Sequence, residues 1–265
     1  NKFLQLLSRV IMKYYLPGKS LFLGNWKKEL SRVNQVIIFD NGFKSVLVKY
    51  IKRKRPDCRI IVFCWNLLGD DNLVLKNKRY IDQIYSFDIN EVAKYQLKFN
   101  NSFYTKDLKL PSVKNEYDLF FLGLDKGRKQ QIDEIKTTCD KYNITTCFKI
   151  IRSEKDYVDY DTYLELLNKS KCVLDITKKG QAGLTVRSME CLFFQKKLIT
   201  DNKNIKRFNF YRKSNIFILG EDSVDDLADF INSSFEKIEQ SIIDEYDYKK
   251  WCLRMLKNEE QKYKK

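Results

Sequence analysis

The sequence predicts an α/β protein with two domains, each built on a parallel sheet. Short apolar runs that read as buried strands alternate with segments whose apolar residues recur at helical spacing, which is typical of α/β folds. A length of 265 residues allows one large domain or two of ordinary size. The polar stretch 105–114, which contains Pro111, is where we expect the linker.

The first domain, residues 1–112, follows a strand, helix, strand order. Its expected strands are 36–40, 59–64 and 85–88, with an extended piece at 99–104, and its expected helices are 43–54 and 89–97. Parallel strands end at one edge of their sheet, so Asp40 and Trp65–Asn66 should share a rim, where α/β proteins bind ligands. Asp40 can act on a ligand there, or it can close its strand by bonding the Asn41–Gly42 turn.

The second domain, residues 113–245, repeats this order, and residues 246–265 follow it. The expected strands are 117–122, 144–151, 171–176, 196–201 and 215–219. The expected helices begin after Arg128, cover 162–169, follow Gly183 and cover 224–238, and a charged terminal helix covers 246–263.

Two glycine-containing loops follow strands of this second sheet. The loop 123–128 carries Lys126, a point charge, and Arg128, whose guanidinium can contact a phosphate through two N–H groups. The loop 177–183 leads into a helix whose free N–H groups and dipole favour an anion. Glycine turns before helices are common, so the prediction of a phosphate site depends on the two loops lying in one sheet.

Glu190 lies about two turns into the helix after Gly183. A carboxylate there could accept hydrogen bonds from a ribose diol, and the alternative is a solvated helix residue. Arg187, near the start of the same helix, could face a phosphate or pair with a carboxylate.

The run Gly183-Leu-Thr-x-Arg187-x-x-Glu190, followed by Lys-Lys-Leu-Ile-Thr and Asn204-Ile205, resembles the donor-binding half of bacterial GT-B glycosyltransferases that build capsule, lipopolysaccharide or related glycans. The resemblance is specific over about residues 115–220. It implies that Glu190 binds the ribose of a nucleotide-sugar and that the preceding loop meets the diphosphate and the sugar. Retaining members carry a second glutamate eight positions earlier, and here that position is Ala182, which favours inverting chemistry.

The resemblance implies two Rossmann-like domains facing a cleft. The donor would bind in residues 113–245 and the acceptor in residues 1–112, and residues 246–265 would form a helix returning to the first domain. The expected donor-binding residues are Gly123, Lys126, Gly127, Arg128, Arg152, Thr177, Gln181, Ala182, Gly183, Leu184, Thr185, Arg187 and Glu190. Inversion needs a base for the acceptor hydroxyl, and in a chain without histidine we assign that role to the carboxylate of Asp40.

No metal and no cofactor are expected. Asp159-Tyr-Asp161 and Gly69-Asp-Asp-Asn72 invite comparison with the metal-binding Asp-x-Asp of the other large glycosyltransferase fold. The first of these lies in a polar loop before a helix, where Asp161 would serve as an N-cap. The chain has no histidine and no Cys-x-x-Cys, which argues against a zinc site, and its seven cysteines are expected to be reduced and buried.

A net charge of +15 predicts an anionic partner: a phosphorylated substrate, an anionic membrane face or a nucleic acid. The basic run 52–55 reads as a solvated helix end, with a nucleic-acid or membrane patch as the alternative. The amphipathic segment 2–16 could lie on a membrane or pack on the first domain. No apolar run reaches membrane-spanning length, and no signal-peptide pattern is evident.

Together these features predict a metal-independent, cytoplasmic glycosyltransferase of the hexosyltransferase type, with or without peripheral contact at the inner face of the plasma membrane. Its partners would be a nucleotide-sugar donor and a glycan or lipid-linked acceptor in bacterial surface polysaccharide synthesis, and not nucleic acid. The alternatives are a nucleotide-sugar epimerase of the same fold, which often relies on histidine, and a basic nucleic-acid-binding protein. The donor sugar, the nucleotide base, the acceptor and the oligomeric state are not predicted.

Overall fold

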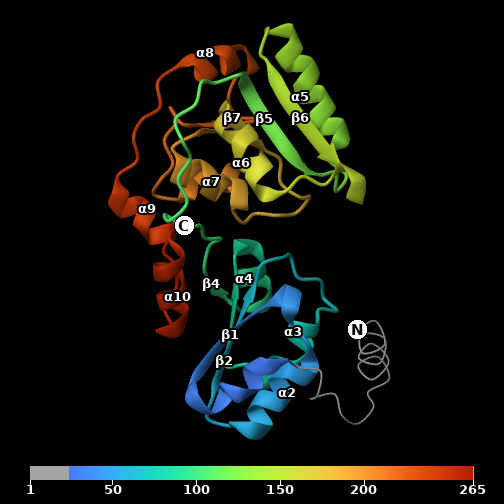
Figure 1. Ribbon diagram of the computed structural model, residues 1–265, viewed down its shortest axis with the longest axis vertical. Coiled ribbons are helices and arrows are strands. Elements are labelled where there is room, and N and C mark those ends of the chain that lie inside the picture. The colour runs from blue at the N-terminus through green and yellow to red at the C-terminus, as the bar shows by residue number, and fades with distance from the viewer. Residues whose placement is uncertain (1–23, 265) are drawn as a thin grey trace. The chain divides into compact units, whose positions relative to one another are not determined.

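The computed structural model describes residues 24–264 and divides the chain into two compact units between Asn100 and Asn101 (Figure 1). The division falls ahead of the expected linker at 105–114, and twelve residues before the expected boundary at 112. The terminal residues, from 246 on, belong to the second unit. The expected amphipathic segment 2–16 lies outside the described residues.

The first unit contains a four-stranded parallel sheet in the order β1-β2-β3-β4. The strands are β1 Gln35–Phe39, β2 Arg59–Cys64, β3 Gln83–Ser86 and β4 Lys98–Phe99, and the α-helices are α2 Ser45–Lys54, α3 Leu73–Lys76 and α4 Ile89–Tyr95. Strand β2 is almost wholly apolar because both its neighbours and both its faces exclude water. The expected strand 59–64 coincides with β2, whereas the expected strands 36–40 and 85–88 differ from β1 and β3 by one and two residues at each end.

The basic run 52–55 ends helix α2, where cations suit the negative end of the helix dipole. Lys52 Nζ bonds Asp82 at 2.8 Å and the carbonyl of Cys58 at 2.9 Å. Arg55 pairs with Asp57 at 2.8 Å. Both side chains are therefore used inside the unit, which supports the helix-end interpretation.

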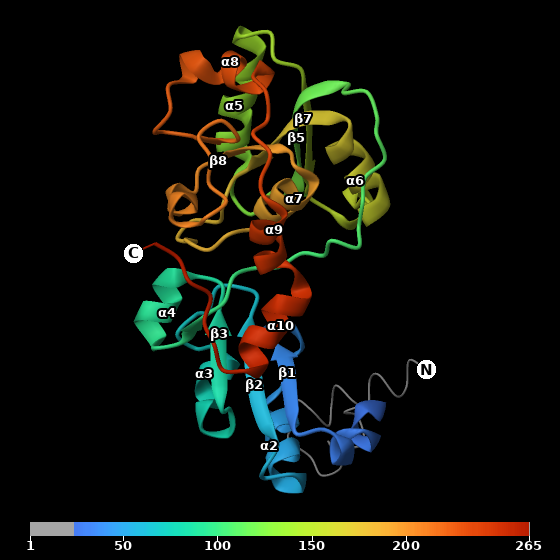
Figure 2. The ribbon, with the colours of Figure 1, turned by 90° about the vertical axis from the view of Figure 1, so that its left-hand side faces the viewer.

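The second unit contains a five-stranded parallel sheet in the order β6-β5-β7-β8-β9. The strands are β5 Tyr117–Leu124, β6 Thr146–Ile151, β7 Ser170–Asp175, β8 Lys197–Thr200 and β9 Ile216–Ile218. The α-helices are α5 Lys129–Lys141, α6 Tyr160–Asn168, α7 Val186–Phe194, α8 Leu227–Asn232, α9 Gln240–Tyr246 and α10 Tyr248–Leu256. Figure 2 shows α5 and α8 on one side of this sheet and α6 on the other.

The faces of β5 explain this layering. Leu119 and Phe121 join the core formed with Ile132 of α5 and Leu227 of α8, while Phe120, between them in sequence, meets the ring of Tyr163 of α6. Successive side chains of a strand point to opposite faces, so one apolar run supplies both layers.

Two expected helices are shorter than the sequence suggests. The helix at 224–238 ends at Asn232, because the side-chain amide of Asn215 exchanges two hydrogen bonds with the backbone of Glu236 and fixes it outside a helix. The terminal helix begins at Tyr248, since Asp247 caps it by accepting from the backbone N–H of Lys249 at 3.0 Å, and it ends at Leu256.

All seven cysteines are free thiols, and all except the half-buried Cys252 are buried, as expected. Within residues 24–264, no helix is long and apolar enough to cross a membrane.

Candidate functional site

The loop after β5 gathers cations at the carboxyl edge of the second sheet. Lys126 and Gly127 have φ of 46° and 77°, a left-handed turn that glycine favours and that carries the chain directly into α5. Asp125 closes the turn, because its Oδ1 accepts from the backbone N–H groups of Arg128 at 3.2 Å and Lys129 at 3.1 Å.

The loop after β7 reaches the same edge, and hydrogen bonds to Asp201, Asn202 and Ser102 hold it in place. Thr177 donates its backbone N–H and its hydroxyl to Asp201 Oδ1, at 2.9 and 3.0 Å. Asn202 Nδ2 donates to the carbonyls of Ala182 and Gly183, at 3.2 Å each, and Ser102 Oγ donates to the carbonyl of Leu184 at 2.9 Å. The loop is thus fixed at its start through the donors of Thr177 and at its end through three carbonyl oxygens.

Gly180 has φ of 85° within this loop, and the backbone N–H of Gln181 bonds the carbonyl of Lys178 at 2.9 Å. The side-chain amide of Gln181 bonds the carbonyl of Gly183 at 3.1 Å. Thr185 then caps α7, because its hydroxyl accepts from the backbone N–H of Ser188.

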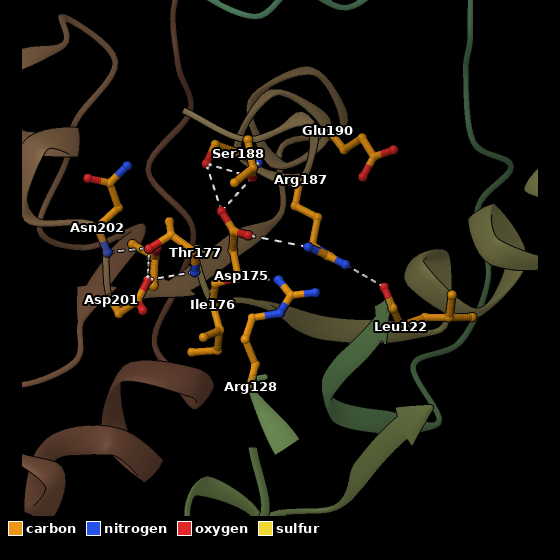
Figure 3. Close-up of polar contacts among 12 residues, drawn as sticks. Leu122, Arg128, Asp175, Ile176, Thr177, Arg187, Ser188, Glu190, Asp201 and Asn202 are labelled. Atoms are coloured by element: carbon orange, nitrogen blue, oxygen red, sulfur yellow. Dashed lines mark hydrogen bonds and ion pairs between the residues drawn. The ribbon is translucent and has the colours of Figure 1, made fainter. Parts of the chain in front are cut away.

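Asp175, the last residue of β7, is the centre of a buried polar cluster (Figure 3). Its Oδ2 accepts from the hydroxyls of Thr185, at 2.5 Å, and Ser188, at 3.1 Å. Its Oδ1 pairs with Arg187 Nη1 at 3.4 Å. Arg187 Nη2 donates to the carbonyl of Leu122 at 2.6 Å, so this side chain links α7 to β5.

The guanidiniums of Arg128 and Arg187 both lie against the aromatic ring of Phe121. The centres of their guanidiniums are 5.5 and 5.0 Å from the centroid of Phe121. Arg128 also donates to the carbonyls of Leu124 and Ile176, where strands β5 and β7 end. The two loops expected to form one site therefore meet through these arginines.

The pKa values around this edge reflect crowded positive charge. Burial and then the charge of Arg187 lower the pKa of the Arg128 guanidinium. Partial burial lowers the pKa of Lys126, and the charges of Arg128, Arg187 and Lys178 lower it further. An anion bound at this edge would reverse these shifts, because an opposite charge favours the protonated forms.

Glu190 is buried, with 2% of its surface exposed, so the solvated alternative is wrong. Its carboxylate accepts from the hydroxyl of Tyr160 at 2.9 Å and from that of Tyr163, and Tyr160 also bonds the hydroxyl of Tyr104. Burial raises the pKa of Glu190 to about 7. Figure 3 shows its side chain pointing away from Asp175. A ribose contact stays a prediction.

Arg152 follows β6 and is exposed, and its backbone N–H bonds Asp156 at 3.2 Å. The N-cap of α6 is Asp159, which accepts from the backbone N–H of Thr162, and not Asp161, which lies inside the first turn. No group of three His, Cys, Asp or Glu residues that could hold a metal occurs in the described part of the chain.

In the first unit, the carboxylate of Asp40 bonds the neighbouring strand end. It accepts from the backbone N–H groups of Trp65, at 2.9 Å, and Asn66, at 3.2 Å, and from Asn66 Nδ2 at 3.2 Å. These donors belong to the loop after β2. The alternative that the Asp40 side chain bonds the Asn41–Gly42 turn is therefore wrong about the partner. The expected rim of Asp40 with Trp65–Asn66 is present, and the role as a base stays a prediction.

Sequence reasoning did not single out Asp175, Asn202 or the pair Tyr160 and Tyr163. Asp175 carried a signal, since it is an acidic residue that ends an otherwise apolar strand. The tyrosines carried none, because their hydroxyls meet Glu190 only through the packing of α6 on α7.

No family model matches the chain, and no curated protein matches it. Solved structures do. An alpha-glucosyltransferase in complex with UDP and a 13-mer DNA has a TM-score of 0.55 at 15% identity, over 89% of this chain and 80% of that one. The chain has the GT-B fold. TarM gives a TM-score of 0.57 at 12% identity, over 88% of this chain and 56% of that one.

The GT-B fold also relates the chain to the Glycosylation Associate Protein (Gap123) complex from Streptococcus agalactiae, with a TM-score of 0.52 at 13% identity, over 87% of this chain and 56% of that one. The expected α/β architecture with two parallel sheets, of four and five strands, is thereby confirmed.

Proposed function

We propose that the protein is a glycosyltransferase that moves a hexose from a nucleotide-sugar donor to a glycan or lipid-linked acceptor. The observation that carries this proposal is the pair of arginines at the carboxyl edge of the second sheet, between the ends of β5 and β7 and the start of α7. Ligands of open α/β sheets bind at such an edge, and a diphosphate matches both the charge and the donor geometry.

The GT-B fold supports the proposal of a nucleotide-sugar donor, as does the UDP bound to the alpha-glucosyltransferase of the same fold. In transfer, Lys126, Arg128 and Arg187 would stabilise the negative charge that develops on the leaving diphosphate. The second unit would take the donor and the first unit the acceptor. A role in capsule or lipopolysaccharide synthesis rests on the sequence resemblance alone.

For the acceptor side, we propose inverting transfer with the Asp40 carboxylate as the base. The position of the second glutamate of retaining relatives is Ala182, which is buried and bonded through its carbonyl to Asn202. Asp40 directly follows β1 at a sheet edge, where a hydroxyl could reach it in exchange for a donor of the Trp65–Asn66 loop.

Binding of nucleoside diphosphates tests the proposal directly. Calorimetry in EDTA would compare UDP, GDP, ADP and CDP with the corresponding nucleosides, on the wild type, Lys126→Gln and Lys136→Gln. Lys126 is exposed at the edge, and Lys136 is an exposed lysine of α5 away from it. At least one diphosphate should bind the wild type. Lys126→Gln should lower the affinity for it about tenfold, whereas Lys136→Gln should leave the affinity unchanged.

A short duplex DNA serves as the comparison, because a charge of +15 also suits a nucleic acid. Binding of DNA that falls steeply with salt, with no binding of any nucleotide, would contradict the proposal. An epimerase would instead convert a nucleotide-sugar without an acceptor, which chromatography of the nucleotide-sugar detects.

A further inference from the structure

The guanidinium of Arg187 is held at both ends. Nη1 faces Asp175 at 3.4 Å and Nη2 donates to the carbonyl of Leu122 at 2.6 Å. A guanidinium has five N–H donors in a rigid plane, so fixing the two terminal nitrogens fixes the direction of the rest. Among the described residues, the buried Nε has no hydrogen-bond partner. The side chain therefore keeps donor capacity that the protein leaves unused.

An unsatisfied buried donor is unfavourable, and native proteins tolerate it mainly where a function needs it. Here the unused donor belongs to an arginine that lies beside Arg128 at a crowded cationic edge, so both its charge and its spare N–H groups favour an anion. The side chain of Arg187 is 16% exposed, so part of it can meet a ligand.

Asp175 does more than pair with this arginine. It is fully buried, and its second oxygen accepts from the hydroxyls of Thr185 and Ser188 at the start of α7. The carboxylate therefore cannot turn toward solvent or toward another cation. One fixed group sets both the first turn of the helix and the arginine that extends from that turn.

Gly123 completes the arrangement. A Cβ added to Gly123 would lie 2.2 Å from Arg187 Nη2, closer than any real contact, so only glycine leaves room for the guanidinium in this position. Since the atom displaced is the far end of a flexible side chain, an alanine at this position would shift the arginine at little cost to the fold.

We propose that Asp175 is a positioning residue that holds Arg187 against Leu122, in the space left by Gly123, so that its free N–H groups meet the diphosphate of the donor. The inference rests on the proposed function. Removal of the buried negative charge of Asp175 raises the local positive potential, which by simple electrostatics would strengthen diphosphate binding. If Asp175 positions Arg187, its removal should instead weaken diphosphate binding.

The experiment is calorimetry with the tightest-binding of UDP, GDP, ADP and CDP, on the full chain. Gly123→Ala changes no charge and should weaken that diphosphate about tenfold, whereas the nucleoside without phosphates should bind as before. Gly69→Ala is the control, because a Cβ at Gly69 meets nothing within 4 Å. Asp175→Asn should also lower the affinity for this diphosphate about tenfold.

A double-mutant cycle with Arg187→Gln separates positioning from a general structural effect. If Asp175 acts through Arg187, Asp175→Asn and Gly123→Ala have no further effect on affinity in the Arg187→Gln background. Should Asp175→Asn fail to fold, the Gly123→Ala arm alone decides. Unchanged or tighter diphosphate binding in Gly123→Ala, with Lys126→Gln still weakened, overturns the inference and leaves the proposed function standing. A wild type that binds no diphosphate overturns both.

Discussion

At the scale of single residues, Glu190 shows what burial does to a carboxyl group. Only 2% of its surface is exposed, and two tyrosine hydroxyls donate to its carboxylate. Burial raises its pKa from 4.5 to about 7. The hydroxyls of Tyr160 and Tyr163 stabilise the carboxylate and oppose the shift without cancelling it. The group therefore changes its charge near neutral pH.

This shift makes stability depend on pH with a defined sign. The folded state binds the proton of Glu190 more tightly than the unfolded chain, so its contribution is fully present below about pH 4.5 and is lost as pH rises through 7. Between pH 5 and pH 8 the wild type should lose on the order of 2–3 kcal/mol relative to Glu190→Gln, which does not titrate. Urea unfolding at both pH values measures the difference.

Glu134→Gln, an exposed carboxylate of α5, is the matched control and should run parallel to the wild type. If Glu190→Gln also runs parallel, Glu190 does not titrate in this range. The result matters for function, because a ribose diol that bonded Glu190 would have to replace the hydroxyl of Tyr160.

At the scale of elements, the loop 177–185 is tied to the body of the second unit by Asn202. This amide donates to two loop carbonyls and, through Oδ1, accepts from the backbone N–H of Asn204. Asn202→Asp keeps the shape and the acceptor, but it replaces the donor with an oxygen that faces the carbonyls of Ala182 and Gly183. The variant should lose about 1–3 kcal/mol of stability and bind nucleoside diphosphate less tightly.

Thermal unfolding and calorimetry test this, with Asn143→Asp, an exposed residue of the same unit, as control. Equal diphosphate affinity in Asn202→Asp and wild type would mean that the loop keeps its conformation without this amide.

The elements also show what the sequence can predict. Strands of parallel sheets are buried on both faces, so β2, β5 and β7 stood out as apolar runs. The two loops at 123–128 and 177–183, which we propose bind a phosphate, were predicted from their glycines. The helix expected at 224–238 was too long because its end is decided by Asn215, which is distant in sequence from the residues it fixes. The contacts of Asp175 and Glu190 were likewise products of packing and not of local pattern.

At the scale of the whole molecule, the chain between the sheets has two parts. Residues 101–104 are largely buried and bond α9 and α10: Tyr104 exchanges backbone hydrogen bonds with Tyr246 and Tyr248, and Trp251 Nε1 donates to the carbonyl of Asn101 at 2.8 Å. Residues 106–116 are mostly exposed. The expected linker at 105–114 covers most of this exposed stretch, and the buried residues 101–104 precede it.

Limited trypsin treatment should therefore cut first at Lys109 or Lys114, both exposed and outside helices and strands. The two fragments should still elute together from a sizing column, because residues 101–104 remain bonded to α9 and α10. Separation appears only in denaturant, where gel electrophoresis shows both pieces. Fragments that separate in native buffer would contradict the importance of this contact.

The contact of residues 101–104 with α10 also bears on how the chain is made. A ribosome produces the first sheet early, and domains generally fold as they emerge, the N-terminal one first. Residues 101–104 follow at once, yet their partners are among the last twenty or so residues of the described chain. The second unit therefore stays incomplete until α9 and α10 have been synthesised, and a chain that stops before α9 leaves the backbone groups of Asn101 and Tyr104 without these partners.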